Sequence, residues 1–174
     1  MQLTGKQIIE RNILTNVDVE NAVQQQGIDV RVARIGTVRY GNVHSTMYPV
    51  GIIPARGKTT LPKTIWLKGF STAENGVLLQ PGYYEIEFIE GCKIPNDCAM
   101  YFKTRSSVIR CGAEVRSGQF DAGFKTEKMG AYLKVELPIV IEYGARLAQV
   151  IINESSPVEN TYEGQWQGDK QRKS

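Results

Sequence analysis

The chain has 174 residues, 41% of them hydrophobic and 22% charged, which suits one folded domain with a buried core. The formal net charge of +3 and the isoelectric point near 8.7 are mild, and no long basic run precedes the last few residues, so a nucleic-acid-binding surface is not expected. The single histidine, His44, excludes a histidine-based zinc site or catalytic triad and is expected in a loop.

The cysteines indicate a reducing environment. Cys92, Cys98 and Cys111 are odd in number and lack the close spacing of metal ligands. The chain also shows no signal peptide and no apolar run long enough to cross a membrane. We therefore predict reduced thiols in a cytoplasmic protein that binds neither membranes nor nucleic acid.

A short helix is predicted at the start of the chain. Thr4 and Gln7 have the spacing of a capping box, and isoleucines at positions 8, 9 and 13 form a partial apolar stripe. From Ile28 to Val32 apolar residues alternate with Asp29 and Arg31, which predicts a half-buried strand with both charges on one face. Asp29 then reaches a functional site, pairs with a neighbouring arginine, or does both.

Short strands separated by turns follow. Glycines and prolines punctuate residues 40–65, which predicts a loop-rich insertion with short strands. After a Pro-Gly turn, alternating residues predict a strand between Leu78 and Glu90. Further strands are predicted at 98–102, 131–136, 139–142 and 147–153. This series favours an all-β fold, either a barrel or a jelly-roll-like sandwich.

The segment from Thr104 to Phe124 carries the residues best suited to a polyphosphate and a water molecule. Arg105 and Arg110 are permanently charged forks for phosphate oxygens, and Ser106 and Ser107 add neutral donors. Asp121 then begins a glycine turn that ends in an aromatic ring. Each fragment also has an ordinary interpretation, as arginines at an exposed strand end and as a simple hairpin turn.

The sequence resembles the trimeric dUTPase and dCTP deaminase superfamily in motifs along nearly the whole chain. The matching segments, in the order of the family, are 24–31, 105–112, 120–124 and 144–149. The resemblance implies a distorted β-barrel of the dUTPase type, mainly β, with a short N-terminal helix. It also implies a homotrimer with shared sites, a barrel domain over 1–153 and a C-terminal arm over 154–174.

The resemblance implies a dUTP diphosphatase that makes dUMP and pyrophosphate with Mg²⁺. Asp121 would take a proton from the attacking water, while Arg110 and Ser106 offset the charge of the transition state. The other implied site residues bind deoxyuridine or deoxycytidine triphosphate, or hold the metal through water. The substrate-binding residues are Arg105, Ser107, Phe124, Gln149, Tyr162 and Trp166, and the metal residue is Asp29.

The tail and one missing acid bear on the choice of reaction. Residues 162–168 resemble the deaminase tail, which closes over the nucleotide, although Gln165 stands where that tail usually has lysine. A deaminase needs a glutamate to move protons, and the matching position holds Ala131. Glu127 or Glu136 would replace it only with a shifted hairpin register.

Two alternatives therefore stay open. One is a dCTP deaminase, or a bifunctional enzyme that converts dCTP to dUMP. The other is a catalytically silent trimer that serves as a nucleotide-binding or structural module. Replacements of expected family residues motivate the silent module: Thr126, Ala131, Ala145 and Gln165.

Overall fold

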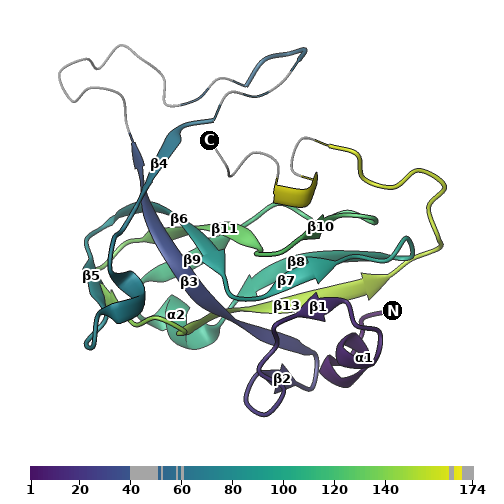
Figure 1. The fold of residues 1–174 in the computed structure, drawn as a ribbon, viewed down its shortest axis with the longest axis horizontal. Coiled ribbons are helices and arrows are strands. Elements are labelled where there is room, and N and C mark those ends of the chain that lie inside the picture. Colours follow the sequence, from purple (N-terminus) through teal and green to yellow (C-terminus); the bar gives the residue numbers. More distant parts are fainter. Residues whose placement is uncertain (40–50, 52, 58, 60, 165–166, 170–174) are drawn as a thin grey trace.

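The computed structural model describes residues 1–39, 51, 53–57, 59, 61–164 and 167–169. The predictions for His44, Gln165 and Trp166 lie outside the described residues. Within the described part, no helix is both long and apolar enough to cross a membrane. Most of the regular structure is β, as Figure 1 shows, which confirms the predicted fold class.

The elements follow one another in the order labelled in Figure 1. The helices are α1 (Gly5–Glu10) and α2 (Ser106–Arg110), with 3-10 turns η1 (Phe70–Thr72) and η2 (Gln167–Asp169). The strands are β1 (Leu14–Thr15), β2 (Val23–Gln24), β3 (Gly27–Arg39), β4 (Lys63–Trp66), β5 (Val77–Leu79), β6 (Gly82–Phe88), β7 (Gly91–Lys93), β8 (Cys98–Thr104), β9 (Ala113–Arg116), β10 (Lys125–Thr126), β11 (Gly130–Val135), β12 (Ile139–Ile141) and β13 (Arg146–Glu154).

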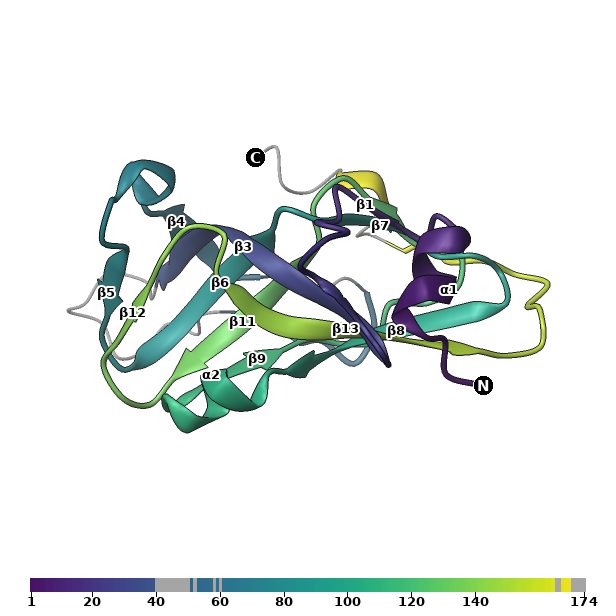
Figure 2. The same cartoon turned by 90° about the horizontal axis from the view of Figure 1, so that it is seen from below.

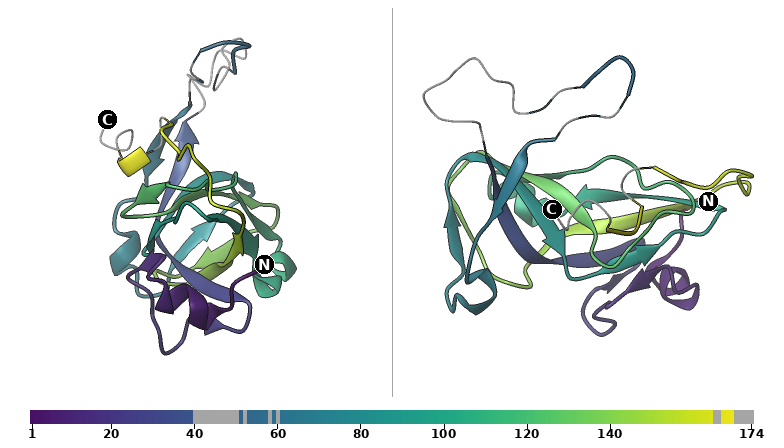
Figure 3. Two further views of the ribbon diagram at one scale, coloured as in Figure 1. Left: turned by 90° about the vertical axis from the view of Figure 1, so that its right-hand side faces the viewer. Right: turned by 45° about the horizontal axis from the view of Figure 1, so that its top comes forward.

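The main sheet closes almost into a barrel. Its antiparallel strands follow the order β8, β13, β3, β6, β11, β9, with β2 and β4 added beside β3. The two ends of this path meet where the Thr104 hydroxyl accepts from the Val115 N–H at 2.9 Å and donates to the Val115 carbonyl at 3.1 Å. In the left view of Figure 3 the strands curve around a common interior.

Strand β3 runs through the whole barrel and is longer than the strand predicted from the sequence. Its first half pairs with β13 and its second half with β6. The register with β6 shifts between Val32 and Arg34, and Val32 and Ala33 are both buried there. Such a bulge shifts the alternation of buried and exposed side chains by one residue. The alternating pattern in the sequence therefore ends at Val32, although the strand continues.

Helix α1 begins as predicted. The Gln7 N–H donates to the Thr4 hydroxyl at 3.3 Å, and the Thr4 N–H donates to the Gln7 side-chain oxygen at 2.9 Å. Gly5 lies against the backbone of residues 24 and 27, where a Cβ atom would meet carbonyl oxygens at 2.2 and 2.6 Å. Figure 2 shows α1 beside the N-terminus, while α2 lies next to β9, away from α1.

The core consists of side chains that point inward from the main sheet and from α1. Members that are fully buried include Ile8, Ile28, Ile86, Phe88, Met100 and Leu133. Burying each side chain of this size stabilises the fold by about 1.5–3 kcal/mol. This is an upper value, because the unfolded chain is itself partly compact and already buries some of the same surface. This interior holds the loops at the strand ends, which carry the polar residues described next.

Candidate active site

The turn at residues 120–124 is held on the barrel by backbone hydrogen bonds. Phe120 and Met100 exchange two bonds of 2.7 and 3.0 Å, and the Gly123 N–H donates to the Ile94 carbonyl at 3.0 Å. The Phe124 N–H donates to the Asp121 carbonyl at 3.1 Å, closing a turn in which Gly123 has φ of 82°. The turn therefore presents an exposed Asp121 carboxylate, whose Oδ1 accepts from the Gln119 amide at 3.0 Å.

A pocket of about 930 Å³ opens beside this turn. Asp121, Phe124 and Tyr162, which were predicted as residues of one site, line one side of it. The outer face of the sheet lines the other side. Its residues were missed from the sequence, and the chief ones are Thr64, Trp66, Glu85, Arg116 and Tyr132.

Strand register brings these outer residues together. Trp66 is opposite Gly36, Gly36 is opposite Glu85, Glu85 is opposite Tyr132, and Tyr132 is opposite Arg116. Directly opposite residues lie on the same face of a sheet, so this row forms a floor across strands β4, β3, β6, β11 and β9. For Glu85 the available signal was the alternation within β6, where it stands between Tyr84 and Ile86.

Polar and aromatic contacts fix the floor. The Thr64 hydroxyl donates to the Glu85 carboxylate. The Arg34 guanidinium lies over the Trp66 ring, 4.1 Å from its centre, and its Nη1 lies 3.0 Å from Oε2 of the buried Glu87. Glu85 and Asp121 are the acids among the described residues that line the pocket. The pocket thus combines two carboxylates with stacking surfaces.

Ala131 also lines the pocket and pairs with Ile86 in β11. Glu127 is exposed, and Glu136 follows the end of β11, where the Lys134 ammonium contacts it at 2.6 Å. Neither glutamate is among the described residues that line the pocket. The shifted register that would bring one of them to position 131 is therefore not the register of this structure.

A row of aromatic rings connects the core with the arm. Phe88 packs on Phe102 with ring centres 4.8 Å apart, Phe102 on Phe120 at 5.3 Å, and Phe120 on Phe124 at 5.3 Å. The Tyr162 ring adds an edge contact to Phe124 at 5.4 Å. Phe124 is 8% exposed, so most of its ring supports the turn and one part faces the pocket.

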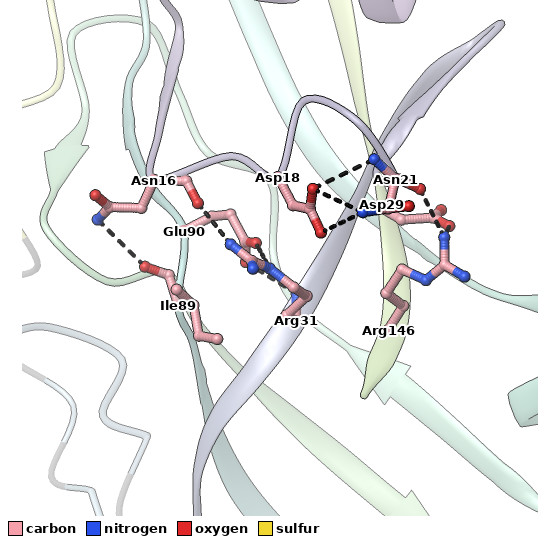
Figure 4. A network of polar contacts seen from close by, with 8 residues as sticks. All are labelled: Asn16, Asp18, Asn21, Asp29, Arg31, Ile89, Glu90 and Arg146. Carbon is pink, nitrogen blue, oxygen red and sulfur yellow. Dashed lines mark hydrogen bonds and ion pairs between the residues drawn. The ribbon is translucent and has the colours of Figure 1, made fainter. Parts of the chain in front are cut away.

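A second group of predicted residues gathers around the buried Asp29. Asp29 Oδ2 lies 3.2 Å from Arg105 Nε and 3.6 Å from Arg146 Nη1, an arginine absent from the predicted site. Arg146 also donates to the Asn21 carbonyl at 2.7 Å, as Figure 4 shows. Burial raises the pKa of the Asp29 carboxyl, while the two arginines act in the opposite direction. Pairing with arginine, one of the two interpretations of Asp29, is the one seen here.

A buried carboxylate between β6 and β7 pairs with Arg31, which lies on the same strand as Asp29. Glu90 is fully buried and accepts from the Arg31 Nε at 2.7 Å and from the Arg31 backbone N–H at 2.9 Å (Figure 4). Arg31 in turn donates to the Asn16 carbonyl at 2.7 Å. These bonds join the segment after β1 and the segment between β6 and β7 to strand β3, two residues from Asp29.

The remaining predicted residues lie at the surface near Asp29. Ser106, Ser107 and Arg110 are exposed on α2, a helix of five residues that follows Arg105. Gln149 is half-buried in β13, opposite Asp29 of β3 and Lys103 of β8. None of these side chains is among the described residues that line the pocket. Within one chain, the pocket and the phosphate-binding candidates are therefore separate groups.

The described residues do not build a dedicated cation site. No group of three or more histidine, cysteine, aspartate or glutamate residues among them is placed to hold a metal. Asp29 is 2% exposed and already balanced by two arginines. Mg²⁺ often binds through one or two carboxylates and the phosphates of a substrate. Asp29, the residue predicted to hold the metal through water, is thus engaged by arginines in the described structure.

Comparisons with known proteins identify a matching family and similar enzymes. A family model described as dCTP deaminase-like matches residues 2–155. The deoxyuridine 5'-triphosphate nucleotidohydrolase of Methanocaldococcus jannaschii is 32% identical over 159 residues, 91% of this chain and 94% of that protein. The dCTP deaminase of Sulfurisphaera tokodaii is 28% identical over 153 residues, 87% of this chain and 76% of that protein.

A solved structure shows the same fold. The 2'-deoxycytidine 5'-triphosphate deaminase of Agrobacterium tumefaciens aligns with a TM-score of 0.62 and 18% sequence identity. The alignment covers 88% of this chain and 48% of that chain, so this chain spans about half the length of that deaminase.

Proposed function

Because the chain belongs to the dCTP deaminase-like family, we propose that it is a dUTP diphosphatase that hydrolyses dUTP to dUMP and pyrophosphate. The observation that carries this proposal is the content of the pocket. It holds an exposed carboxylate, Asp121, on a turn beside an aromatic ring, and it has Ala131 where a deaminase would need a proton-moving glutamate. Relatives named for dUTP hydrolysis and for dCTP deamination agree with the predicted reaction and its alternative.

Asp121 acts as the general base. Gln119 holds one carboxylate oxygen, which leaves the other free to accept a proton from water that attacks the α-phosphorus. The Phe124 ring stacks under the deoxyribose and excludes a 2'-hydroxyl. The reaction needs in addition a set of cations for the phosphates.

Those cations come from a neighbouring subunit of a homotrimer. Arg105, Arg110, Ser106 and Ser107 lie apart from their own pocket, and α2 exposes Ser106, Ser107 and Arg110 together with Ile109, which is 57% exposed. Asp29 orients Arg105, and Gln149 on the adjacent strand holds a phosphate oxygen. Mg²⁺ chelated by the triphosphate neutralises part of its charge when it is bound.

The arm and the cellular setting complete the proposal. Residues 1–153 form the barrel domain and 154–174 the arm, in agreement with the end of β13 at Glu154. Tyr162 and Trp166 of the arm contact the nucleotide. We place the protein in the cytoplasm, without nucleic-acid or membrane partners, and the odd number of cysteines, three, suits that reducing compartment.

Two other functions remain as alternatives. Deamination of dCTP, alone or followed by hydrolysis to dUMP, is favoured by Glu85, a second acid in the pocket that the Thr64 hydroxyl orients. A silent nucleotide-binding trimer is favoured by Thr126 and Ala145, which depart from the expected family residues. Release of ammonia from dCTP distinguishes the first alternative, and trimer formation without turnover distinguishes the second.

Replacement of Asp121 tests the proposed base. We expect D121N to bind α,β-imido-dUTP with nearly unchanged affinity and to lose turnover by roughly 10²–10⁴-fold, because the amide cannot accept the proton. The matched control is E159Q, which neutralises an exposed arm carboxylate and should remain active. Undiminished turnover by D121N would remove Asp121 from the catalytic role.

A further inference from the structure

Gln167 makes an unusual set of contacts with the turn that carries Asp121. Its side-chain oxygen accepts from the Lys125 N–H at 2.9 Å. Its side-chain nitrogen donates to the Gly123 carbonyl at 2.9 Å and to the Tyr162 carbonyl at 3.1 Å. One amide thus bonds the peptide groups on both sides of Phe124 and also bonds the arm itself.

The rest of the arm fits the same turn. The Tyr162 N–H donates to the Ala122 carbonyl at 2.8 Å, and the Tyr162 ring packs edge-on against Phe124. Thr161 lies so close to Gly123 that a Cβ atom there would meet the Thr161 Cβ at 2.4 Å. Figure 1 shows the arm, in yellow, with η2 above β10. The arm therefore docks on the turn of its own chain.

Gly164 completes the docked arm. A Cβ atom at this position would meet the Tyr162 ring at 2.3 Å, so the backbone of residue 164 covers one part of that ring. The Tyr162 ring is thereby enclosed by Gly164 and Phe124, which are contributed by the arm and by the turn. This packing brings Gln167 back to the peptide groups of residues 123 and 125.

We infer that Gln167 is a positioning residue that fixes the Phe124 ring and the Asp121 turn for nucleotide binding, through the arm of the same chain. An amide suits this role because its oxygen meets an N–H while its nitrogen meets two carbonyl groups. The expected effect on enzyme kinetics rests on the proposed function, whereas the expected effect on the docking of the arm rests on the contacts alone.

The structural consequence is measured by amide hydrogen exchange without nucleotide. In Q167A the backbone amides of Lys125 and Tyr162 should exchange at least about tenfold faster. The Lys125 N–H loses its acceptor on Gln167, and the Tyr162 N–H loses protection because the arm no longer stays docked. The Met100 and Phe120 amides bond each other and should be unchanged. The matched control is N160A, which removes an exposed amide of the arm and should leave all four rates as they are.

The kinetic consequence is a rise in KM for dUTP with little change in kcat. We expect Q167A to raise KM by about tenfold, a size typical of lost hydrogen bonds that order a binding site. Q167E keeps the shape and the acceptor for Lys125 but has no donor for the two carbonyl groups at neutral pH. It should therefore be at least as impaired as Q167A, which a role in merely filling space would not produce.

The two readouts separate the outcomes. Faster exchange at Lys125 with no turnover of dUTP by the wild type would support the docking and overturn the proposed function. If the wild type turns over dUTP but Q167A and Q167E match N160A in KM and in amide exchange rates, the role of Gln167 is overturned. A loss confined to kcat would also overturn it, since positioning for binding predicts a change in KM.

Discussion

Arg11 joins three segments that are distant in the sequence. Its Nη2 lies 2.7 and 2.8 Å from the two carboxylate oxygens of Asp97, and its Nη1 lies 2.8 Å from Glu154 Oε1. The residue just outside α1 is thus tied to the turn before β8 and to the root of the arm. The Arg11 guanidinium lowers the pKa of the Asp97 carboxyl below its ordinary value.

This pKa shift makes part of the stability depend on pH. A carboxyl whose pKa is lowered by folding stabilises the fold above its unfolded pKa, about 3.9, and the contribution disappears as the pH falls through the lower, folded value. We expect D97N to reduce the free energy of unfolding by about 1 kcal/mol at pH 7, a value that allows for partial exposure.

Urea unfolding of the wild type and D97N at a series of pH values provides the measurement. The difference between them should be constant from pH 7 to about pH 5 and should shrink below about pH 4. E136Q, which removes one partner of an exposed pair with Lys134, serves as the control and should change little. A difference that grows as the pH falls would contradict the assignment to Asp97.

Single residues of the site differ in how well the sequence predicted them. Asp121, Phe124 and Tyr162 come from local motifs, and the structure has all three lining one pocket, although their roles remain predictions. Trp66 and Tyr132 enter the pocket through strand register, which pairs residues far apart in the chain. No local pattern determines such pairings, so the positions of Trp66 and Tyr132 in the floor of the pocket were not predictable.

Among the elements, the turn at Gly123 is sensitive to a single added methyl group. Its φ of 82° costs an L-residue about 1–2 kcal/mol, and the space that a Cβ would occupy is filled by Thr161. We expect G123A to be destabilised by at least this amount and to release the arm. Thermal unfolding and the KM for dUTP measure the two effects.

Substitutions at two other glycines distinguish the cost of backbone strain from the cost of a steric clash. Gly144 has φ of 78° with no atom within 4 Å of an added Cβ, so G144A should show the cost of the backbone conformation alone. Gly118 is equally open and lacks a positive φ, so G118A should be neutral or slightly stabilising. Equal melting temperatures for G123A and G144A would show that the arm does not dock on the turn.

The elements missed from the sequence are short. Helix α2 has five residues and no side-chain cap, which is too little chain for a helical period to appear. Strand β9 has only four residues, and β10 only two. In contrast, α1 was predictable from its capping box, and β6, β11, β12 and β13 from alternation or apolar runs.

At the scale of the whole molecule, the separation of the pocket from α2 predicts sites that form between chains. Variants D121N and R110A should each be inactive as pure proteins. After co-refolding, random mixing in a trimer would give roughly a quarter of the sites both an intact turn and an intact α2. Activity regained in the mixture, beside a trimeric mass by light scattering, would support shared sites.

The same mixture also shows the result expected if sites are not shared between chains. If each site lay within one chain, no subunit of the mixture would carry both groups, and the mixture would stay as inactive as its components. A wild-type monomer with full activity would contradict shared sites even more simply.

The central claim is dUTP hydrolysis at the Asp121 pocket, and product analysis tests it most directly. The purified protein would be incubated with Mg²⁺ and either dUTP or dCTP, followed by chromatography of the nucleotides and assays for pyrophosphate and ammonia. We predict dUMP and pyrophosphate from dUTP, and no ammonia from dCTP. Ammonia from dCTP would contradict the role given to Ala131, and the absence of any product would contradict hydrolysis and favour the silent nucleotide-binding module.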